Sequence, residues 1–303
     1  MYFAVNNIIL NFFWILYLIS LKGIVIEKSK ITSIAIGGFD GMHLAHQELF
    51  KKLDDTGGII IIQTTHANIS PFRNRQKYTK FPIYFYPLKN IKHLDGKQFI
   101  MLLKEEFPNL SKIVVGYDFH FGHKAAYNCN NLISLFDGEV EIVEEYKIDG
   151  ISVHSRIIRS YLRDGNIQLS NRLLGYNYTL SGLAIVGQGL GKKQFVPTIN
   201  IKVTDFLIPQ EGIYITKTIL NEFIYPSVTF IGHRVTTDGK FAMETHILKD
   251  EFTQEVPKNI EIEFLEKIRN NKKFDKFGDL KKQIDCDVNF AKLWFKEKNE
   301  ECN

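Results

Sequence analysis

The pattern of apolar residues changes at Gly175, and this change constrains the fold more than any other feature of the sequence. Before Gly175, mainly apolar runs such as Ile59–Ile62 and Lys112–Gly116 alternate with segments of helical spacing such as Gln98–Glu106. Such runs are typical of strands that are buried on both faces of a parallel sheet. Their alternation with helices predicts a doubly wound, Rossmann-like α/β domain.

After Gly175 the chain consists of short runs of alternating polarity separated by Gly, Pro and Asn, a pattern typical of a small closed β-barrel. We predict barrel strands at Tyr178–Val186, Ile199–Val203, Ile213–Leu220, Tyr225–Ile231, Phe241–Leu248 and Ile260–Leu265. A final helix should follow Gly278 and pack on the barrel, because apolar residues recur there at helical spacing. These residues are Leu280, Ile284, Val288, Ala291 and Phe295.

A chain of 303 residues is too long for one ordinary core, and we predict three parts. Residues 1–23 form an apolar N-terminal segment whose status the sequence leaves open, residues 24–174 the α/β domain, and residues 175–303 the barrel domain with its helix. The stretch Tyr2–Leu21 has no charged residue, and its length of about 20 residues would span a bilayer. It lacks the basic start and the cleavage site of a secretory signal, so we expect an added segment. A membrane anchor is the alternative, and membrane contact is expected only in that case.

Charge and cysteine content limit the partners. The formal net charge is only +4, and the basic stretch Lys267–Lys282 is interrupted by acidic and apolar residues. We therefore expect no nucleic-acid partner. The cysteines Cys129, Cys286 and Cys302 are odd in number and scattered, which argues against a disulfide framework and a zinc site and favours a reducing, cytoplasmic compartment. The oligomeric state is left open.

The stretch from position 34 to 46 combines a buried strand, a glycine turn and the start of a helix. Gly37 and Gly41 allow backbone conformations that other residues avoid, and His43 and His46 lie on one face of the first helical turn. The helix N–H groups and the two imidazoles would then converge on one anion, which favours a phosphate site. A plain surface turn carrying two unrelated histidines is the alternative.

This stretch, G-G-F-D-G-M-H-L-A-H, resembles the G-x-F-D-G-x-H-x-G-H signature of the bacterial bifunctional riboflavin kinase/FMN adenylyltransferase family. It departs from the signature at Gly38 and Ala45, where the family has asparagine and glycine. Gly116–Gly122 resembles the family's G-x-D-F-R-F-G loop, and Ser155–Arg159 resembles part of its S-S-T-x-I-R element. The resemblance implies catalytic roles for His43 and His46. It also implies nucleotide contacts from Gly37, Phe39, Asp40, Gly41, Gly116, Asp118, Ser155 and Arg159.

Two segments of the barrel domain resemble the riboflavin kinase half of the same family. Pro197–Asn200 resembles its P-T-A-N signature, which implies that Thr198 and Asn200 bind Mg²⁺ and ATP phosphate. Met243–Leu248 resembles its E-x-H-x-L strand, which implies that Glu244 is the catalytic base. Without the resemblance, Glu244 would be read as an ordinary solvent-facing residue of a barrel strand.

A glycine-rich loop precedes the first of these segments and is flexible enough to lie over phosphates, although glycines also mark plain hairpins. The residues of this loop that we expect to contact the nucleotide are Gly187, Gly189, Gly191 and Lys192.

The resemblance implies an enzyme of FAD biosynthesis whose co-substrate is ATP and whose cofactor is Mg²⁺. The barrel would phosphorylate riboflavin to FMN, and the α/β domain would adenylylate FMN to FAD. The departures at Gly38 and Ala45, and the absence of the family's Phe-x-Pro-x-Pro pattern, leave a riboflavin kinase with a weakened first domain as the alternative. A non-catalytic flavin or nucleotide sensor and a nucleotidyltransferase for another phosphate ester are the further alternatives.

Overall fold

The computed structural model describes residues 26–64, 67–185, 196–234, 236, 238–249, 252 and 254–300. The apolar stretch Tyr2–Leu21 and the glycine-rich loop Gly187–Lys192 lie outside these residues. Within the described part of the chain, no helix is long and apolar enough to cross a membrane. Internal contacts divide the chain into two compact units, Met1–Val153 and His154–Asn303. The predicted domain boundary after Leu174 lies within the second unit and stays a prediction.

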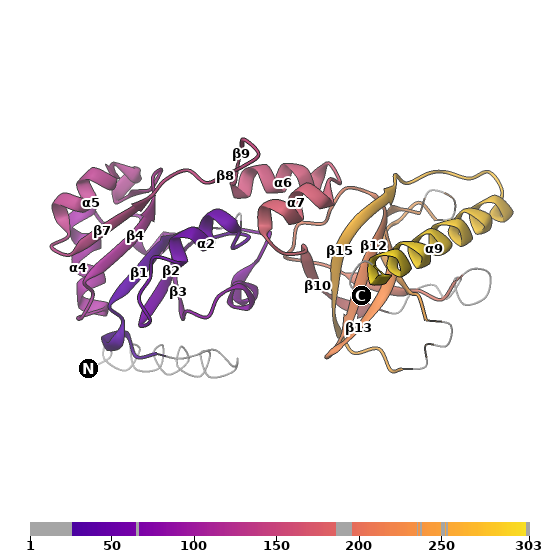
Figure 1. The fold of residues 1–303 in the computed structure, drawn as a ribbon, viewed down its shortest axis with the longest axis horizontal. Coiled ribbons are helices and arrows are strands. Elements are labelled where there is room, and N and C mark those ends of the chain that lie inside the picture. The colour runs from indigo at the N-terminus through magenta and orange to yellow at the C-terminus, as the bar shows by residue number, and fades with distance from the viewer. Residues whose placement is uncertain are drawn as a thin grey trace. The chain divides into compact units, whose positions relative to one another are not determined.

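The first unit is built on a five-stranded parallel sheet with the order β3-β2-β1-β4-β7, which Figure 1 shows with β1 at its centre. The strands are β1 Ser33–Gly37, β2 Gly57–Gln63, β3 Ile83–Pro87, β4 Lys112–Gly116 and β7 Glu139–Val143. The predicted parallel α/β sheet is thus confirmed. The edge strand β3 was not predicted, because prolines at positions 82 and 87 bound it and proline usually marks a loop or an edge.

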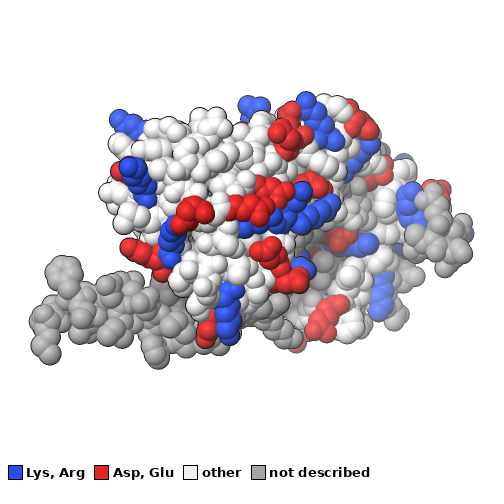
Figure 2. Space-filling model, turned by 60° about the vertical axis from the view of Figure 1, so that its left-hand side comes forward, with Lys and Arg blue, Asp and Glu red and all other residues white. Residues whose placement is uncertain are grey.

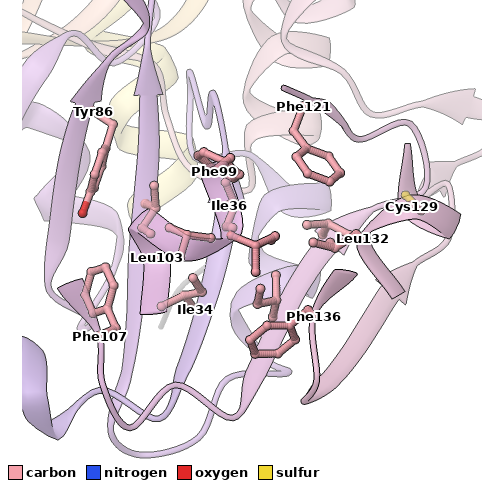
Figure 3. Packing of buried hydrophobic residues seen from close by; sticks show 14 of the residues in the cluster. Ile34, Ile36, Tyr86, Phe99, Leu103, Phe107, Phe121, Cys129, Leu132 and Phe136 are labelled. Carbon is pink, nitrogen blue, oxygen red and sulfur yellow. The ribbon is translucent and has the colours of Figure 1, made fainter. Parts of the chain in front are cut away.

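Helices cover both faces of this sheet. They are α2 Leu44–Phe50, α3 Leu88–Ile91, α4 Gly96–Glu106 and α5 Cys129–Leu135, with 3-10 turns η1 Lys28–Lys30, η2 Phe72–Tyr78 and η3 His123–Ala125. Capping boxes at Asp95 and Asn128 start α4 and α5. On the face of the sheet that α4 and α5 cover, Ile34 and Ile36 of β1 pack with aromatic and aliphatic residues that include Leu103 of α4 (Figure 3). A separate core on the other face includes Leu49 and Phe50 of α2.

The second unit contains a closed six-stranded antiparallel barrel with the order β10-β11-β14-β13-β12-β15. Its strands are β10 Thr179–Ile185, β11 Ile199–Lys202, β12 Gly212–Leu220, β13 Phe223–His233, β14 Phe241–Ile247 and β15 Asn259–Arg269. All six predicted strands are therefore present in the described residues. The unit begins with two helices, α6 Ser155–Arg163 and α7 Ile167–Leu174, although the helical pattern of the sequence continues to Leu174 and favours one helix. They separate because Gly165 adopts φ 73° and Asn166 caps α7 by accepting the Leu169 N–H.

The barrel interior carries a network of buried hydroxyl groups. Each of the five residues is fully buried, and they are connected by hydrogen bonds of 2.8 to 3.0 Å. They are Thr216, Thr218, Ser227, Thr229 and Thr245. Because side chains alternate along a strand, the inward-facing Thr245 places its neighbour Glu244 on the outer face of the barrel.

The C-terminal helix α9, Phe277–Glu300, packs on the outside of the barrel, as the spacing of its apolar residues predicts. Ala291 is fully buried and belongs to one cluster with Ile213, Ile215 and Val228. No residue of the predicted apolar stripe is exposed. The Asp287 carboxylate accepts hydrogen bonds from Arg269 Nε at 2.9 Å and Arg269 Nη2 at 2.6 Å, and this paired contact ties α9 to β15.

We expect Asp287→Ala to lower the free energy of unfolding by about 2 to 3 kcal/mol, because it leaves the largely buried Arg269 guanidinium without its counter-charge. This loss is smaller than that expected for a fully buried ion pair, because the Arg269 side chain is 22% exposed. Urea denaturation measures the change, with the exposed Asp285→Ala as the matched control. Equal unfolding midpoints for the two variants would show that the ion pair does not hold the helix.

Candidate active sites

The glycine turn lies where doubly wound sheets bind ligands. It follows β1, and the strand order reverses there, since β2 pairs with one side of β1 and β4 with the other. Ligands of such sheets bind beyond the carboxyl ends of the strands at this switch point. The loop that begins at Gly116 follows the neighbouring strand β4, so the sheet brings both predicted nucleotide elements to the same edge.

The turn has an unusual backbone. Gly41 adopts φ 84°, and the non-glycine residues Phe39 and Met42 adopt φ 43° and 42°, a region that side chains disfavour. Both side chains are buried in the core, which offsets this cost, and the Phe39 ring packs edge-on against His46 at 5.0 Å between centroids. A Cβ at Gly37 would lie 2.9 Å from the Phe39 ring, so glycine is required at that position.

Asp40 is 5% exposed, and its carboxylate binds backbone rather than solvent. It accepts N–H groups from Asn68, Ile69 and Ser70 at 3.0 to 3.2 Å, while the Gly41 N–H donates to Ser70 Oγ at 2.7 Å. These bonds join the segment after β2 to the glycine turn. In this structure Asp40 therefore shapes the turn, as the buried Phe39 does, and direct nucleotide contact by either residue stays a prediction.

Arg75 lies beside Asp40 and was not identified from the sequence. Its Nη2 is 3.9 Å from Asp40 Oδ1, and only 1% of the residue is exposed. Burial lowers the pKa of the Arg75 guanidinium from its ordinary value, and the Asp40 carboxylate acts in the opposite direction. The arginine occurs in a polar stretch without a recognisable motif, so only its burial beside Asp40 reveals it.

The structure brings His43 and His46 together. His43 is the N-cap of α2, and its Nδ1 accepts the His46 backbone N–H at 3.4 Å. The two rings stack with centroids 3.4 Å apart and an angle of 19° between their planes. His43 is 2% exposed, whereas His46 is half-buried, so His46 is the more accessible imidazole for a bound anion.

The loop that follows β4 is held by Cys129, another residue not identified as part of the site. The Cys129 Sγ lies 3.5 Å from the carbonyl oxygen of Gly116, 3.7 Å from that of Tyr117 and 3.8 Å from that of Phe119. Burial raises the pKa of this thiol from its ordinary value, which favours its neutral, donating form. Asp118 remains exposed on the same loop.

Ser155 and Arg159 lie on α6 in the second unit and are both half-buried. His154 is the N-cap of this helix, and Ser155 is its first residue. A helix therefore begins at this element, but the structure describes the two units separately. A shared nucleotide site with His43 and His46 stays a prediction.

The barrel brings together three residues predicted from motifs far apart in the sequence. Thr198 Oγ1 donates to Glu244 Oε2 at 3.3 Å, although the two residues are 46 positions apart. Asn200 pairs with Glu244 in the register between β11 and β14, which makes their side chains neighbours on the outer face. Glu244 is 18% exposed, so its carboxylate is partly shielded from solvent.

His246 and Pro197 support this arrangement. The His246 Nδ1 contacts the Pro197 carbonyl oxygen at 2.8 Å, which fixes the segment just before Thr198 against β14. Burial lowers the pKa of His246 from its ordinary value, so the ring is neutral near pH 7 and donates its Nδ1–H to that carbonyl.

Arg234 completes the barrel site and was also not identified from the sequence. It follows the last residue of β13, and its Nη1 lies 3.5 Å from Glu244 Oε1. Its Nε lies 3.4 Å from Asp238 Oδ1. A lone arginine after a strand carries no recognisable signal, and only the pairing of β13 with β14 places it beside the carboxylate.

The donor atoms of this site suit a hard cation. Thr198 supplies a hydroxyl oxygen and Asn200 an amide oxygen, with the Glu244 carboxylate adjacent. Mg²⁺ prefers such oxygens and commonly keeps waters and substrate phosphates as its other ligands. No group of three His, Cys, Asp or Glu residues suited to a metal occurs in the described ranges, so a site made only of such ligands is not seen there.

Comparison with known proteins shows which proteins the chain resembles. The riboflavin kinase (flavokinase) model matches residues 174–295. A bifunctional riboflavin kinase/FMN adenylyltransferase of Listeria monocytogenes is 28% identical over 293 residues, which cover 86% of this chain and 92% of that protein. Over most of its length the chain is therefore similar to bifunctional riboflavin kinase/FMN adenylyltransferases.

A second relative and one solved structure are also similar over most of the chain. The family member of Bacillus subtilis is 28% identical, with 89% of this chain and 94% of that protein covered. A crystal structure described as a macrolide-efflux protein from Streptococcus pneumoniae has a TM-score of 0.76 and 24% identity, and covers 88% of this chain and 95% of that one. This last likeness supports the fold alone.

Proposed function

We propose that this transferase makes FAD from riboflavin in two ATP-dependent steps, phosphorylation in the barrel unit and adenylylation in the α/β unit. The observation that carries the proposal is the contact between Thr198 and Glu244, with Asn200 across the strand pair. A carboxylate beside two hard oxygen donors is what phosphoryl transfer to an alcohol requires. The substrates are then riboflavin, FMN and ATP.

In the kinase step, the Glu244 carboxylate accepts the proton of the terminal riboflavin hydroxyl. That oxygen forms a bond to the γ-phosphorus, the bond from the γ-phosphorus to the β–γ bridging oxygen breaks, and ADP leaves with the electron pair. Thr198 and Asn200 would hold Mg²⁺ together with the ATP phosphates. When bound, the ion neutralises charge on the phosphate oxygens.

The adenylylation step needs no strong base, because the phosphate of FMN has a second pKa of about 6 and is mostly ionised near neutral pH. One of its oxygens forms a bond to the α-phosphorus of ATP, and the bond to pyrophosphate breaks. Catalysis then depends on positioning and on donors for the growing negative charge. We assign that role to His43, His46 and the backbone N–H groups of the glycine turn.

The test is to incubate the purified protein with riboflavin, ATP and Mg²⁺ and to separate riboflavin, FMN and FAD. We expect FMN to form first and FAD to follow, and a parallel reaction with supplied FMN and ATP should give FAD directly. FMN without FAD in both reactions would favour the kinase-only alternative. Tight flavin binding without any product would favour the sensor.

The remaining alternatives account for fewer of the observations. A sensor has no use for a carboxylate beside two hard oxygen donors, and a nucleotidyltransferase for another phosphate ester leaves the barrel unexplained.

Figure 2 shows Lys and Arg side chains interspersed with Asp and Glu on the face drawn, rather than in one continuous basic stripe. We therefore keep small anionic and flavin substrates as the proposed partners, with a cytoplasmic location where ATP is plentiful.

We expect Ala45→Gly to raise the rate of FAD formation from supplied FMN severalfold, because Ala45 lies in the first turn of α2, between the two histidines that would bind phosphate, where the family's signature has glycine. At the other departure from the signature, an asparagine side chain could begin without a clash, since a Cβ at Gly38 would meet no atom within 4 Å. Initial rates at varied ATP concentration measure the effect. An unchanged or lower rate would mean that the backbone has already adapted to alanine.

A further inference from the structure

We propose that Arg234 acts directly in phosphoryl transfer, by leaving Glu244 and binding the γ-phosphoryl group as it moves to riboflavin. The inference rests on the proposed kinase function and adds a residue to it. The starting observation is that both oxygens of the Glu244 carboxylate are engaged. Oε2 accepts the Thr198 hydroxyl at 3.3 Å, and Oε1 lies 3.5 Å from Arg234 Nη1.

This arrangement places Arg234 within reach of the reacting atoms. A general base lies about 3 Å from the hydroxyl oxygen whose proton it takes, and that oxygen lies about 3 to 3.5 Å from the atom it attacks. Only the riboflavin hydroxyl would therefore lie between the γ-phosphorus and the Glu244 carboxylate. The Arg234 guanidinium already contacts that carboxylate, so it is close enough to reach the phosphoryl oxygens. Thr198 lies against the other carboxylate oxygen, so the phosphoryl group would be bounded by Arg234 and by the proposed cation ligands.

The backbone before and at Arg234 is held firmly. Glu211 accepts the His233 N–H at 3.1 Å with Oε2 and contacts His233 Nδ1 at 2.8 Å with Oε1, and Asn271 donates to the His233 carbonyl at 2.8 Å. Gly232 adopts φ 146°, and a Cβ there would lie 2.6 Å from Glu211 Oε2, so glycine makes this clamp possible.

Arg234 is also fixed on its C-terminal side, because its N–H donates to the Lys240 carbonyl at 2.9 Å and its carbonyl accepts the Gly239 N–H at 3.1 Å. The main chain therefore presents the side chain from a fixed point. The guanidinium remains able to exchange the carboxylate for phosphoryl oxygens, because its fork of donors can bind two oxygens of either group.

The exchange has a chemical consequence. In the substrate-free site Arg234 balances the charge of Glu244. Once the phosphoryl group binds, its oxygens carry more charge than the carboxylate and draw the guanidinium away, which leaves Glu244 Oε1 able to accept the riboflavin hydroxyl proton. The positive charge then stabilises the transferring group while the bond to ADP breaks.

The test compares the full-length parent with Arg234→Met, Arg234→Lys and Glu244→Gln. Arg172→Met, on the exposed face of α7, is the matched control for loss of an arginine. Riboflavin phosphorylation gives kcat and KM, and FAD formation from supplied FMN and thermal unfolding report on the fold. A second measurement is the affinity for ADP with Mg²⁺ and aluminium fluoride, a mimic of the transferring phosphoryl group, relative to the affinity for ADP with Mg²⁺ alone.

We expect Arg234→Met to lower kcat for riboflavin phosphorylation by about 10² to 10³. The KM values for riboflavin and for ATP should stay within about threefold of those of the parent. Arg234→Met should also lose the extra affinity that aluminium fluoride confers. Arg234→Lys should recover part of the kcat and part of the extra affinity that aluminium fluoride confers. Arg172→Met should match the parent in both measurements.

A kcat of Arg234→Met close to that of the parent would overturn the role of Arg234. The role would also be overturned if Arg234→Met raised KM instead of lowering kcat, or if Arg234→Lys were no more active than Arg234→Met. If Glu244→Gln retains the parent rate, it is the proposed base that fails, whatever the arginine variants show.

Discussion

Glu244→Gln should lower riboflavin phosphorylation by a factor of about 10² to 10⁴, the usual contribution of a positioned general base. Glutamine keeps the size of the side chain and can still accept the Thr198 hydroxyl, which lies 3.3 Å from the carboxylate. It cannot take the riboflavin proton. The measurement is FMN produced from riboflavin and ATP, under conditions in which the parent enzyme is saturated.

The same variant should still convert supplied FMN to FAD, because the histidines that we propose for adenylylation, His43 and His46, lie in the other unit and that step needs no strong base. Glu222→Gln, in the exposed turn between β12 and β13, is the matched control and should behave as the parent in both assays. Near-normal phosphorylation by Glu244→Gln would mean that another group is the base. Loss of both activities would contradict the division of the two reactions between the units.

His46→Ala should lower FAD formation from supplied FMN by about 10² to 10³, the typical cost of removing one donor that stabilises growing negative charge. His46 is the half-buried member of the stacked pair with His43, so it is the imidazole we expect to contact the phosphates. Phosphorylation of riboflavin in the barrel should persist. Measuring FMN and FAD separately in one reaction then shows FMN accumulating.

Because the His46 ring packs on Phe39, the alanine variant also removes a core contact. His46→Gln retains a side-chain donor and should keep more activity than His46→Ala, which separates the loss of a donor from the loss of packing. His93→Ala, an exposed histidine between α3 and α4, is the control. If His46→Ala forms FAD at the parent rate while its thermal unfolding is unchanged, the phosphate site lies elsewhere.

Local patterns predicted most of the secondary structure. The barrel strands and α9 carry clear two-residue and helical periodicities, and these periodicities arise from which face of each element is buried. Strand β3 was missed because prolines bound an aromatic run, and its identity as a strand depends on pairing with β2. The break between α6 and α7 was missed because a single glycine in a helical pattern is often tolerated.

The sequence alone determined the two kinds of domain, the glycine turn with its paired histidines and the three motif residues of the barrel site, because each is encoded within a few consecutive positions. Tertiary structure decided which distant residues support them. Asp40 reaches the backbone of Asn68 to Ser70, Cys129 holds the loop after β4, and Arg234 meets Glu244. Such contacts depend on strand order and register, and residues that meet across a sheet leave no periodic signal in the chain.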